Sequence, residues 1–346
     1  MSKKNSSAKK FKKKFQENSR ILNVYNVFKK NISFSKKNLI VVAVSGGADS
    51  LALSALTKFN QYNGNNKYFY VLIDHGYRKN SAIEALKVRK MIKTKINENL
   101  IIIKNKQKFK SNLQKNFREI RYKNLFNFCI KKKAKILMTA HHFNDQIETF
   151  LIRLARGSGV QGLSSMQMIN KTNKKVKLVR PLLEVKKKDL KFIAKKIFNN
   201  YLKDPSNISK KFLRSNIRTL TSQLENYGIS HDQIFRSIRN INATNDLVNQ
   251  YTNDLMKKTV TRKRGLILIK QKNFFSYDTE IKRIIIGRLI KDVNKKDYPP
   301  RSKKISFVIK KFEEGSLNKL TLGGCVLRLN DSHITIQKEV KKPDFY

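Results

Sequence analysis

The stretch VVAVSGGADS, residues 41–50, runs from four apolar residues directly into two glycines, an acid and two serines. Such apolar residues are typical of a strand that is buried on both faces. The glycines allow the backbone to approach an anion closely, and the N–H groups at the start of a helix carry partial positive charge. The stretch therefore predicts a phosphate cradle between a strand and a helix. The alternative is an ordinary tight turn capped by Asp49.

The chain around this stretch alternates between short apolar runs and segments of helical periodicity. Strands that are apolar throughout and alternate with helices predict an α/β domain with a parallel sheet. In such a sheet, ligands bind beyond the carboxyl ends of the strands, where the loop at 45–50 lies. The four expected strand and helix pairs are 38–44 with 49–59, 68–74 with 81–96, 100–104 with 112–132, and 135–140 with 142–156.

After Pro181 the pattern becomes mainly helical, with one amphipathic helix in 184–198 and mostly helix across 210–260. Near the end, two strands are expected around an Asn330-Asp331 turn. These changes predict four parts of the chain. They are a basic N-terminal arm with a lead-in helix (1–36), the α/β catalytic domain (37–222), a mainly helical domain (223–295) and a small C-terminal α+β element (296–346).

The charge of the chain is extreme, because 76 Lys and Arg side chains face 24 Asp and Glu, for a net charge of +52. Such an excess favours a polyanionic partner, most plausibly nucleic acid. The alternative is a lysine-rich composition of the kind that an AT-rich genome produces. The same lysines predict that the N-terminal arm is a solvated tail, with contact to RNA as the second interpretation.

Several other classes of protein are disfavoured by composition. No apolar run approaches the roughly 18 residues of a membrane span, and the N-terminus lacks the apolar core of a secretory signal. We therefore expect a cytoplasmic protein without a membrane partner. Cys129 and Cys325 stand alone without a C-x-x-C pair, which disfavours a disulfide scaffold, a zinc site and a cysteine-held cluster.

A second constellation lies in TAHHFNDQIETFLIRLARGSGVQGLSSM, residues 139–166. On a helix, His141, Asp145 and Glu148 fall on one stripe at the carboxyl end of a strand. They predict a catalytic or binding cluster, with an ordinary solvated helix face as the alternative. The segment GSGVQG (157–162) matches the dinucleotide fingerprint by letter, but it follows a helix instead of a strand, so NAD binding is rejected.

These motifs resemble those of a known family. SGGADS resembles the S-G-G-x-D-S loop of the PP-loop ATP pyrophosphatases, whose domain has an adenine nucleotide alpha hydrolase-like fold. The pattern AHHxxDQxETxLxRLxRGSGxxGL is similar to that of one group among them, the tRNA(Ile)-lysidine synthases. Further segments agree with that group: HGYR (75–78), LQKNFREIRY (113–122), VRPLL (179–183), DPSN (204–207) and RSNIR (214–218). The sequence departs from the family pattern at Asp74, where asparagine is usual, and at Asn216, where a basic residue is usual.

The resemblance implies an activity. In this family the wobble cytidine of tRNA(Ile) with a CAU anticodon is first adenylated by ATP, and free L-lysine then displaces AMP to give lysidine. The implied partners are tRNA(Ile), ATP with Mg²⁺, and L-lysine. The helical domain would hold the tRNA, and the oligomeric state is left open between a monomer and a homodimer.

The resemblance also implies roles for individual residues. The catalytic residues would be Asp49, His141, Asp145 and Glu148. Asp49 would also be associated with Mg²⁺. Asp145 and Glu148 would hold the lysine, and either His141 or His142 would act in proton transfer. The ATP site would be formed by Ser45, Gly46, Gly47, Ala48, Asp49, Ser50 and His75. Contacts to tRNA or phosphate would come from Arg78, Arg118, Arg121, Arg214 and Arg218.

Three rival functions share some of these features. A PP-loop tRNA thiolase would use the same loop, but sulfur insertion usually requires reactive or cluster-binding cysteines. A small-molecule enzyme such as NAD synthetase would have no need of a charge of +52. A non-catalytic RNA-binding protein would explain the charge but neither SGGADS nor the stripe of His141, Asp145 and Glu148.

Overall fold

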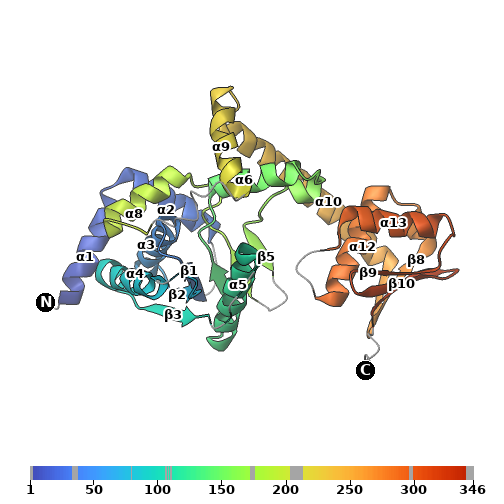
Figure 1. The fold of residues 1–346 in the computed structure, drawn as a ribbon, viewed down its shortest axis with the longest axis horizontal. Helices are drawn as coiled ribbons and strands as arrows, with labels where there is room; N and C mark the ends of the chain where they lie inside the picture. The colour runs from blue at the N-terminus through green and yellow to red at the C-terminus, as the bar shows by residue number, and fades with distance from the viewer. Residues whose placement is uncertain are drawn as a thin grey trace. The chain divides into compact units, whose positions relative to one another are not determined.

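The computed structural model divides the chain into two compact units, residues 1–242 and 243–346 (Figure 1). The structure describes residues 3–32, 38–78, 80–105, 107, 109, 111–171, 176–202, 213–295 and 299–339. The limit between the units at 242 and 243 does not coincide with the limits expected near 222 and 295. None of the helices in the described part of the chain is long and apolar enough to span a membrane.

The first unit is built on a six-stranded sheet in the order β3-β2-β1-β4-β6-β5. All neighbouring strands are parallel except β5, which pairs antiparallel with β6 at the edge. The parallel α/β sheet is thus confirmed, while the two short strands β5 and β6 were not expected. The bounds are β1 (Leu39–Val44), β2 (Lys67–Asp74), β3 (Leu100–Lys104), β4 (Ile136–Met138), β5 (Ile169–Lys171) and β6 (Lys177–Val179).

Helices cover both faces of this sheet and bury its apolar strands between two cores (Figure 1). One face is covered by α3 (Ala48–Tyr62), α4 (Ser81–Ile96) and α8 (Lys187–Phe198), and the other by α5 (Leu113–Lys131). A third apolar cluster, around Phe143 and Ile238, joins helices at the carboxyl edge of the sheet. These are α6 (Phe143–Leu154), α9 (Leu213–Asn226) and the first part of α10 (His231–Thr259), and the short helix α7 (Val160–Leu163) packs on α6.

The N-terminal segment forms two helices, α1 (Lys3–Gln16) and α2 (Ser19–Asn31), that pack on the first unit. Phe15 is fully buried and stacks on Phe59 of α3 with ring centroids 4.4 Å apart. The expectation of a solvated tail is therefore wrong for this segment. Lysines dominate its composition, but aromatic residues spaced along the helices supply an apolar face that binds to the core.

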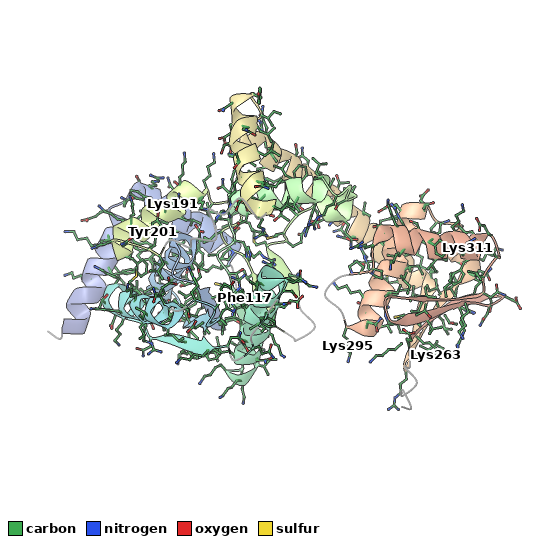
Figure 2. All side chains as sticks on the ribbon, viewed as in Figure 1. Phe117, Lys191, Tyr201, Lys263, Lys295 and Lys311 are labelled. Carbon is green, nitrogen blue, oxygen red and sulfur yellow. The ribbon has the colours of Figure 1, made fainter. Side chains whose placement is uncertain are left out.

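The second unit is an antiparallel five-stranded sheet in the order β7-β8-β11-β10-β9, with helices packed on one face. Its C-terminal part holds three strands instead of the expected two, because Gly323 and Gly324 both have positive φ (65° and 85°) and turn β9 into β10. Exposed lysines such as Lys263 and Lys295 extend from this unit (Figure 2). The elements are β7 (Val260–Lys263), β8 (Leu266–Lys270), α11 (Gln271–Phe275), α12 (Thr279–Asn294), α13 (Ser302–Glu313), β9 (Lys319–Leu322), β10 (Cys325–Leu329) and β11 (His333–Lys338).

Candidate active site

The loops after β1 and β4 meet at the carboxyl edge of the sheet. In the order β3-β2-β1-β4, strands β2 and β3 lie on one side of β1 and β4 lies on the other. The connections from β1 and β4 therefore leave in opposite directions and open a crevice, the usual ligand position in such folds. The loop at 45–50 and the residues 141–148 both begin at this crevice.

The Ser50 hydroxyl closes the loop after β1 on itself. It accepts hydrogen bonds from the backbone N–H and the hydroxyl of Ser45, each at 3.1 Å, and donates to the carbonyl of Gly47 at 3.0 Å. Gly47 is the N-cap of α3 and has no side chain that could bond to the first N–H groups of the helix. Such N–H groups can bind an anion, so the phosphate cradle stays a prediction with which this geometry is consistent.

Gly46 is required by the shape of the loop. Its φ of +83° lies in the region that favours glycine, and a Cβ atom there would lie 2.5 Å from Cγ2 of Val88 and 3.0 Å from Cδ1 of Leu202. The backbone N–H of Leu202 donates to the carbonyl of Gly46 at 2.9 Å. The chain after α8 therefore supports the loop directly.

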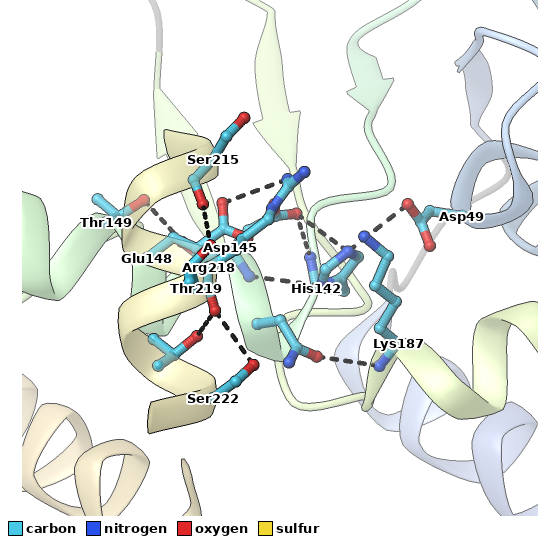
Figure 3. A network of polar contacts seen from close by, with 12 residues as sticks. Asp49, His142, Asp145, Glu148, Thr149, Lys187, Ser215, Arg218, Thr219 and Ser222 are labelled. Atoms are coloured by element: carbon cyan, nitrogen blue, oxygen red, sulfur yellow. Dashed lines mark hydrogen bonds and ion pairs between the residues drawn. The ribbon is translucent and has the colours of Figure 1, made fainter. Parts of the chain in front are cut away.

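His142 joins the two loops (Figure 3). It is the N-cap of α6, where its Nδ1 accepts the N–H of Asp145 at 3.4 Å while the Asp145 carboxylate accepts the N–H of His142 at 3.1 Å. Its Nε2 lies 3.5 Å from Oδ2 of Asp49 and 3.6 Å from Oδ2 of Asp145. Because Nδ1 accepts, the neutral ring carries its proton on Nε2, which faces both carboxylates.

Charges around this group favour an ion pair. Burial by itself would raise the pKa of Asp49, but the hydrogen bond to His142 and the charges of His142, Lys187 and Lys191 lower it. Burial by itself would lower the pKa of His142, but Asp49 and Asp145 raise it. Lys187, at the start of α8, extends its side chain toward Asp49 and His142 (Figure 3). Neither lysine was expected to take part from the sequence.

His141 does not lie in the stripe with Asp145 that helical spacing predicts, because α6 begins only at Phe143. Its Nδ1 lies 2.8 Å from the Thr139 hydroxyl. Burial lowers the pKa of His141 well below its usual value, and four arginine charges lower it further. These are Arg180, Arg118, Arg121 and Arg214. The charges of three predicted arginines thus act on His141, together with the charge of Arg180. The only sequence signal for Arg180 was its place before Pro181 in VRPLL.

Glu148 forms a bidentate pair with Arg218. The guanidinium of Arg218 donates from Nε to Oε1 at 2.5 Å and from Nη2 to Oε2 at 3.4 Å. The carboxylate is almost fully buried, whereas the Arg218 side chain is 31% exposed. This pair holds α9 against α6, so the predicted lysine-binding carboxylate of Glu148 is already neutralised by a cation.

The remaining predicted residues lie toward β2 or outside this group. His75 packs against Phe117 of α5 with ring centroids 4.8 Å apart, and Arg78 forms an ion pair with Glu84 at 3.2 Å. Asp74 accepts the N–H of Gly76 through Oδ1 at 3.0 Å, a contact that asparagine would make equally well. Asn216 is exposed on α9. The DPSN motif lies outside the described residues.

One atom at the site suits a cation. Oδ1 of Asp49 is buried and has no hydrogen-bond partner among the described residues. Within the same residues, no group of three or more His, Cys, Asp and Glu side chains is placed to hold a metal ion. A single carboxylate beside a phosphate cradle fits Mg²⁺, which commonly takes one or two carboxylates together with substrate phosphates and water.

Known proteins share this architecture. The PP-loop domain family matches residues 11–224. The tRNA(Ile)-lysidine synthase of Wolbachia pipientis wMel is 32% identical over 89% of this chain and 72% of its own length. That of Rickettsia typhi is 28% identical over 92% of this chain and 75% of its own length. A structure of a U34-tRNA thiolase from Methanococcus maripaludis, with its 4Fe–4S cluster, shares the fold at a TM-score of 0.55 and 19% identity, over 65% of this chain and 79% of that one.

Proposed function

Because the chain belongs to the tRNA(Ile)-lysidine synthase family of PP-loop proteins, we propose that it is the ATP-dependent ligase that forms lysidine at the wobble cytidine of tRNA(Ile) with a CAU anticodon. The observation that supports this most is the group of Asp49, His142 and Asp145. It joins the nucleotide loop after β1 to the start of α6 within one crevice. The proposed reaction requires ATP, the target base and an amine to reach this one crevice.

In the first step, O2 of the cytidine attacks the α-phosphorus of ATP. The new O–P bond forms as the bond to the β-phosphate breaks, and pyrophosphate leaves with the bonding electrons. The N–H groups at the start of α3 would bind the phosphates, while the hydroxyls of Ser45 and Ser50, which bond within the loop, would keep those groups in place. The arginines around His141 would neutralise the charge that develops.

In the second step, the ε-amine of lysine attacks C2 of the adenylated base. A C–N bond forms, the C2–O bond breaks, and AMP leaves. Lysine arrives as an ammonium and must lose a proton before it can attack. Asp145 would hold the ammonium, with Glu148 sharing its carboxylate between the lysine and Arg218. Burial and the arginines lower the pKa of His141, which keeps its ring neutral but makes it a weak base. His141 would therefore orient the amine by a hydrogen bond, and the proton would pass to water.

We propose Asp49 as the protein ligand of Mg²⁺, since Oδ1 is buried and unsatisfied within the described residues. When bound, Mg²⁺ would neutralise phosphate charge and orient the triphosphate. His142 would then keep the other oxygen of Asp49 in place, because its Nε2 lies beside Oδ2.

The tRNA would be held by the basic surface of the chain, including the helical segment at 223–295. Backbone contacts of this kind weaken steeply as salt increases. Since the proposed substrate is tRNA, we expect the protein in the cytoplasm. A thiolase is not favoured, because both Cys129 and Cys325 are buried and each lies in a different unit. A purely RNA-binding protein would not require the carboxylates around His142.

The test is one reaction of purified protein with Mg-ATP, L-lysine and a tRNA(Ile) transcript bearing CAU, read by nucleoside mass spectrometry. Lysidine that appears only with ATP supports the proposal. Pyrophosphate release without lysidine would keep the adenylation step and reject either lysine or this tRNA. Folded protein that gives neither product would reject the proposed enzyme. An Asp49→Asn variant that retains full activity would reject the role of Asp49.

A further inference from the structure

A cavity of about 430 Å³ opens at the carboxyl ends of β2 and β3. Asp74 and Lys104 are register partners at the ends of these strands, so they face the cavity from adjacent positions. It lies at the same edge of the sheet as the loop at 45–50, on the β3 side of β2. The lining includes Asp74, Tyr77, Arg78, Ser81, Lys104 and Asn105.

An exposed aromatic ring stands at this cavity. Tyr77 is 61% exposed, although tyrosine gains free energy when its ring is covered. Its ring packs edge-on against the ring of Phe117 of α5, which Figure 2 labels. The ring centroids are 5.2 Å apart and the angle between the ring planes is 62°. His75 packs on Phe117 as well. One side of Tyr77 is thus held by the protein, and most of its surface is free to stack on a flat partner.

The charges around the cavity differ from those of the crevice. Arg78 and Lys104 are basic, and Asp74 is the one acid among the lining residues. Asp74 is buried, and the hydrogen bond from the N–H of Gly76 fixes its carboxylate. A fixed carboxylate accepts hydrogen bonds from an amine, an aromatic ring stacks on a base, and nearby cations bind phosphate. Together these groups match an unstacked nucleotide.

We propose that this cavity binds one unstacked nucleobase of the RNA substrate, beside the base that reacts; the inference rests on the proposed function for its RNA. Tyr77 stacks on the base, Asp74 accepts its exocyclic amine, and Lys104 lies near its phosphate. A carboxylate only accepts, so Asp74 favours bases with an exocyclic amine (cytosine, adenine and guanine) over uracil, which has none. The adenine of ATP is a second source of such a base. ATP, however, has its phosphates at the loop at 45–50, whereas each RNA nucleotide brings a phosphate of its own to Lys104, beside Arg78 and its partner Glu84.

The test measures binding of fluorescent six-nucleotide single-stranded RNAs, rich in cytosine, adenine or uracil, to the full chain, and separately the affinity for Mg-ATP. Loss of one stacked base corresponds to about 1–3 kcal/mol, or roughly 5- to 150-fold in affinity. We expect Tyr77→Ala to weaken binding of cytosine- and adenine-rich RNA by such a factor and to leave Mg-ATP affinity unchanged. Asp74→Asn keeps the Gly76 contact and should reduce the preference over uracil-rich RNA. The matched control is Phe307→Ala, an aromatic side chain of α13 that is 53% exposed and lies outside the helical segment at 223–295.

The outcomes separate this inference from the proposed function. If Tyr77→Ala weakens Mg-ATP binding and spares RNA, the cavity belongs to the adenine of ATP and the inference is wrong. The inference is also wrong if Tyr77→Ala and Phe307→Ala bind RNA with equal affinity. It is wrong as well if the wild type binds none of the RNAs, even where the wild type makes lysidine. If the wild type makes no lysidine, but Tyr77→Ala weakens RNA binding and the control variant does not, the proposed base-binding cavity is supported and the proposed function fails. Tyr77 is exposed, so thermal unfolding should show that the variant folds.

Discussion

The Nε2 atom of His142, at the start of α6, lies 3.5 Å from Oδ2 of Asp49, in the first turn of α3. This contact joins two helices that follow neighbouring strands of the sheet but stand far apart in sequence. The same ring caps α6 and lies beside Asp145. One side chain therefore sets the position of two carboxylates and of the helix that carries one of them.

Replacing His142 by asparagine separates these two roles. Asparagine is a good N-cap residue, so α6 should keep its start, whereas alanine should cost about 1 kcal/mol of stability. Asparagine is too short to contact Asp49, so this carboxylate loses its partner. We expect His142→Asn to unfold near the wild-type temperature and to form lysidine about 10- to 100-fold more slowly, by analogy with the loss of other orienting partners. Unchanged single-turnover rates for this variant would show that the contact has no part in the reaction.

The two adjacent histidines should affect stability in different ranges of pH. The pKa of His141 lies well below 6.5, so below that pH the unfolded chain binds a proton that the folded chain does not, and stability rises with pH. The pKa of His142 lies above 6.5, so its contribution is complete below 6.5 and is lost as pH rises through the folded value.

Urea unfolding across this pH range checks both signs. His141→Asn should remove part of the destabilisation on the acid side of 6.5, and His142→Asn should remove part of the decline on the alkaline side. Parallel pH profiles for the two variants would contradict the assignment of opposite shifts.

Much of the fold could be predicted because its signals are local. Apolar runs bounded by polar turns identified β1 to β4, and the periodic segments between them identified α3 to α6. The same reasoning missed β5 and β6, since three residues are too few to show a period. It missed the buried face of α1, where lysines surround Phe11 and Phe15. The adjacent glycines at 323 and 324 are a local signal for the turn between β9 and β10, although only two strands were expected here.

The site was predicted in its composition more than in its geometry. Asp49 and Asp145 both lie beside His142 because both follow strands at the carboxyl edge, which sequence order can indicate. Helical spacing could not predict that His142 is the residue that contacts both carboxylates, because this depends on where α6 begins. Likewise, the pairing of Glu148 with Arg218 depends on the packing of α9, a helix 70 positions away in sequence.

Two glycines of the nucleotide loop should respond differently to alanine. At Gly46 the positive φ and the short approach to Val88 should destabilise the folded state by about 2–4 kcal/mol. At Gly47 the φ is −73°, and a Cβ atom would lie no closer than 3.6 Å to Oγ of Ser45. Gly47→Ala should therefore stay folded and lose mainly ATP affinity, because a methyl group would stand where phosphate approaches. Chemical denaturation with ATP-binding titrations checks this, and equal stability of the two variants would contradict it.

The pair of Glu148 and Arg218 should show strong coupling. Removing Arg218 leaves a buried carboxylate without its partner, which typically destabilises a protein by about 3–5 kcal/mol. Glu148→Gln leaves a neutral amide and should cost less. The double variant Glu148→Gln with Arg218→Met should recover part of the loss, and a double-mutant cycle of unfolding free energies measures the coupling. Additive effects would show that the two side chains act independently.

The N-terminal helices should be part of the folding unit of residues 1–242. Phe15 is fully buried against Phe59, and the phenylalanines of α1 and α2 join the same apolar core as α3 and α8. Phe15→Ala should therefore destabilise this unit by about 3–5 kcal/mol, as is typical for a buried aromatic side chain. Lys9→Ala, on the exposed face of the same helix, is the control and should change stability by less than about 0.5 kcal/mol. If both variants unfold at the wild-type temperature, α1 does not contribute to the core, and the basic segment acts as the tail that its composition suggests.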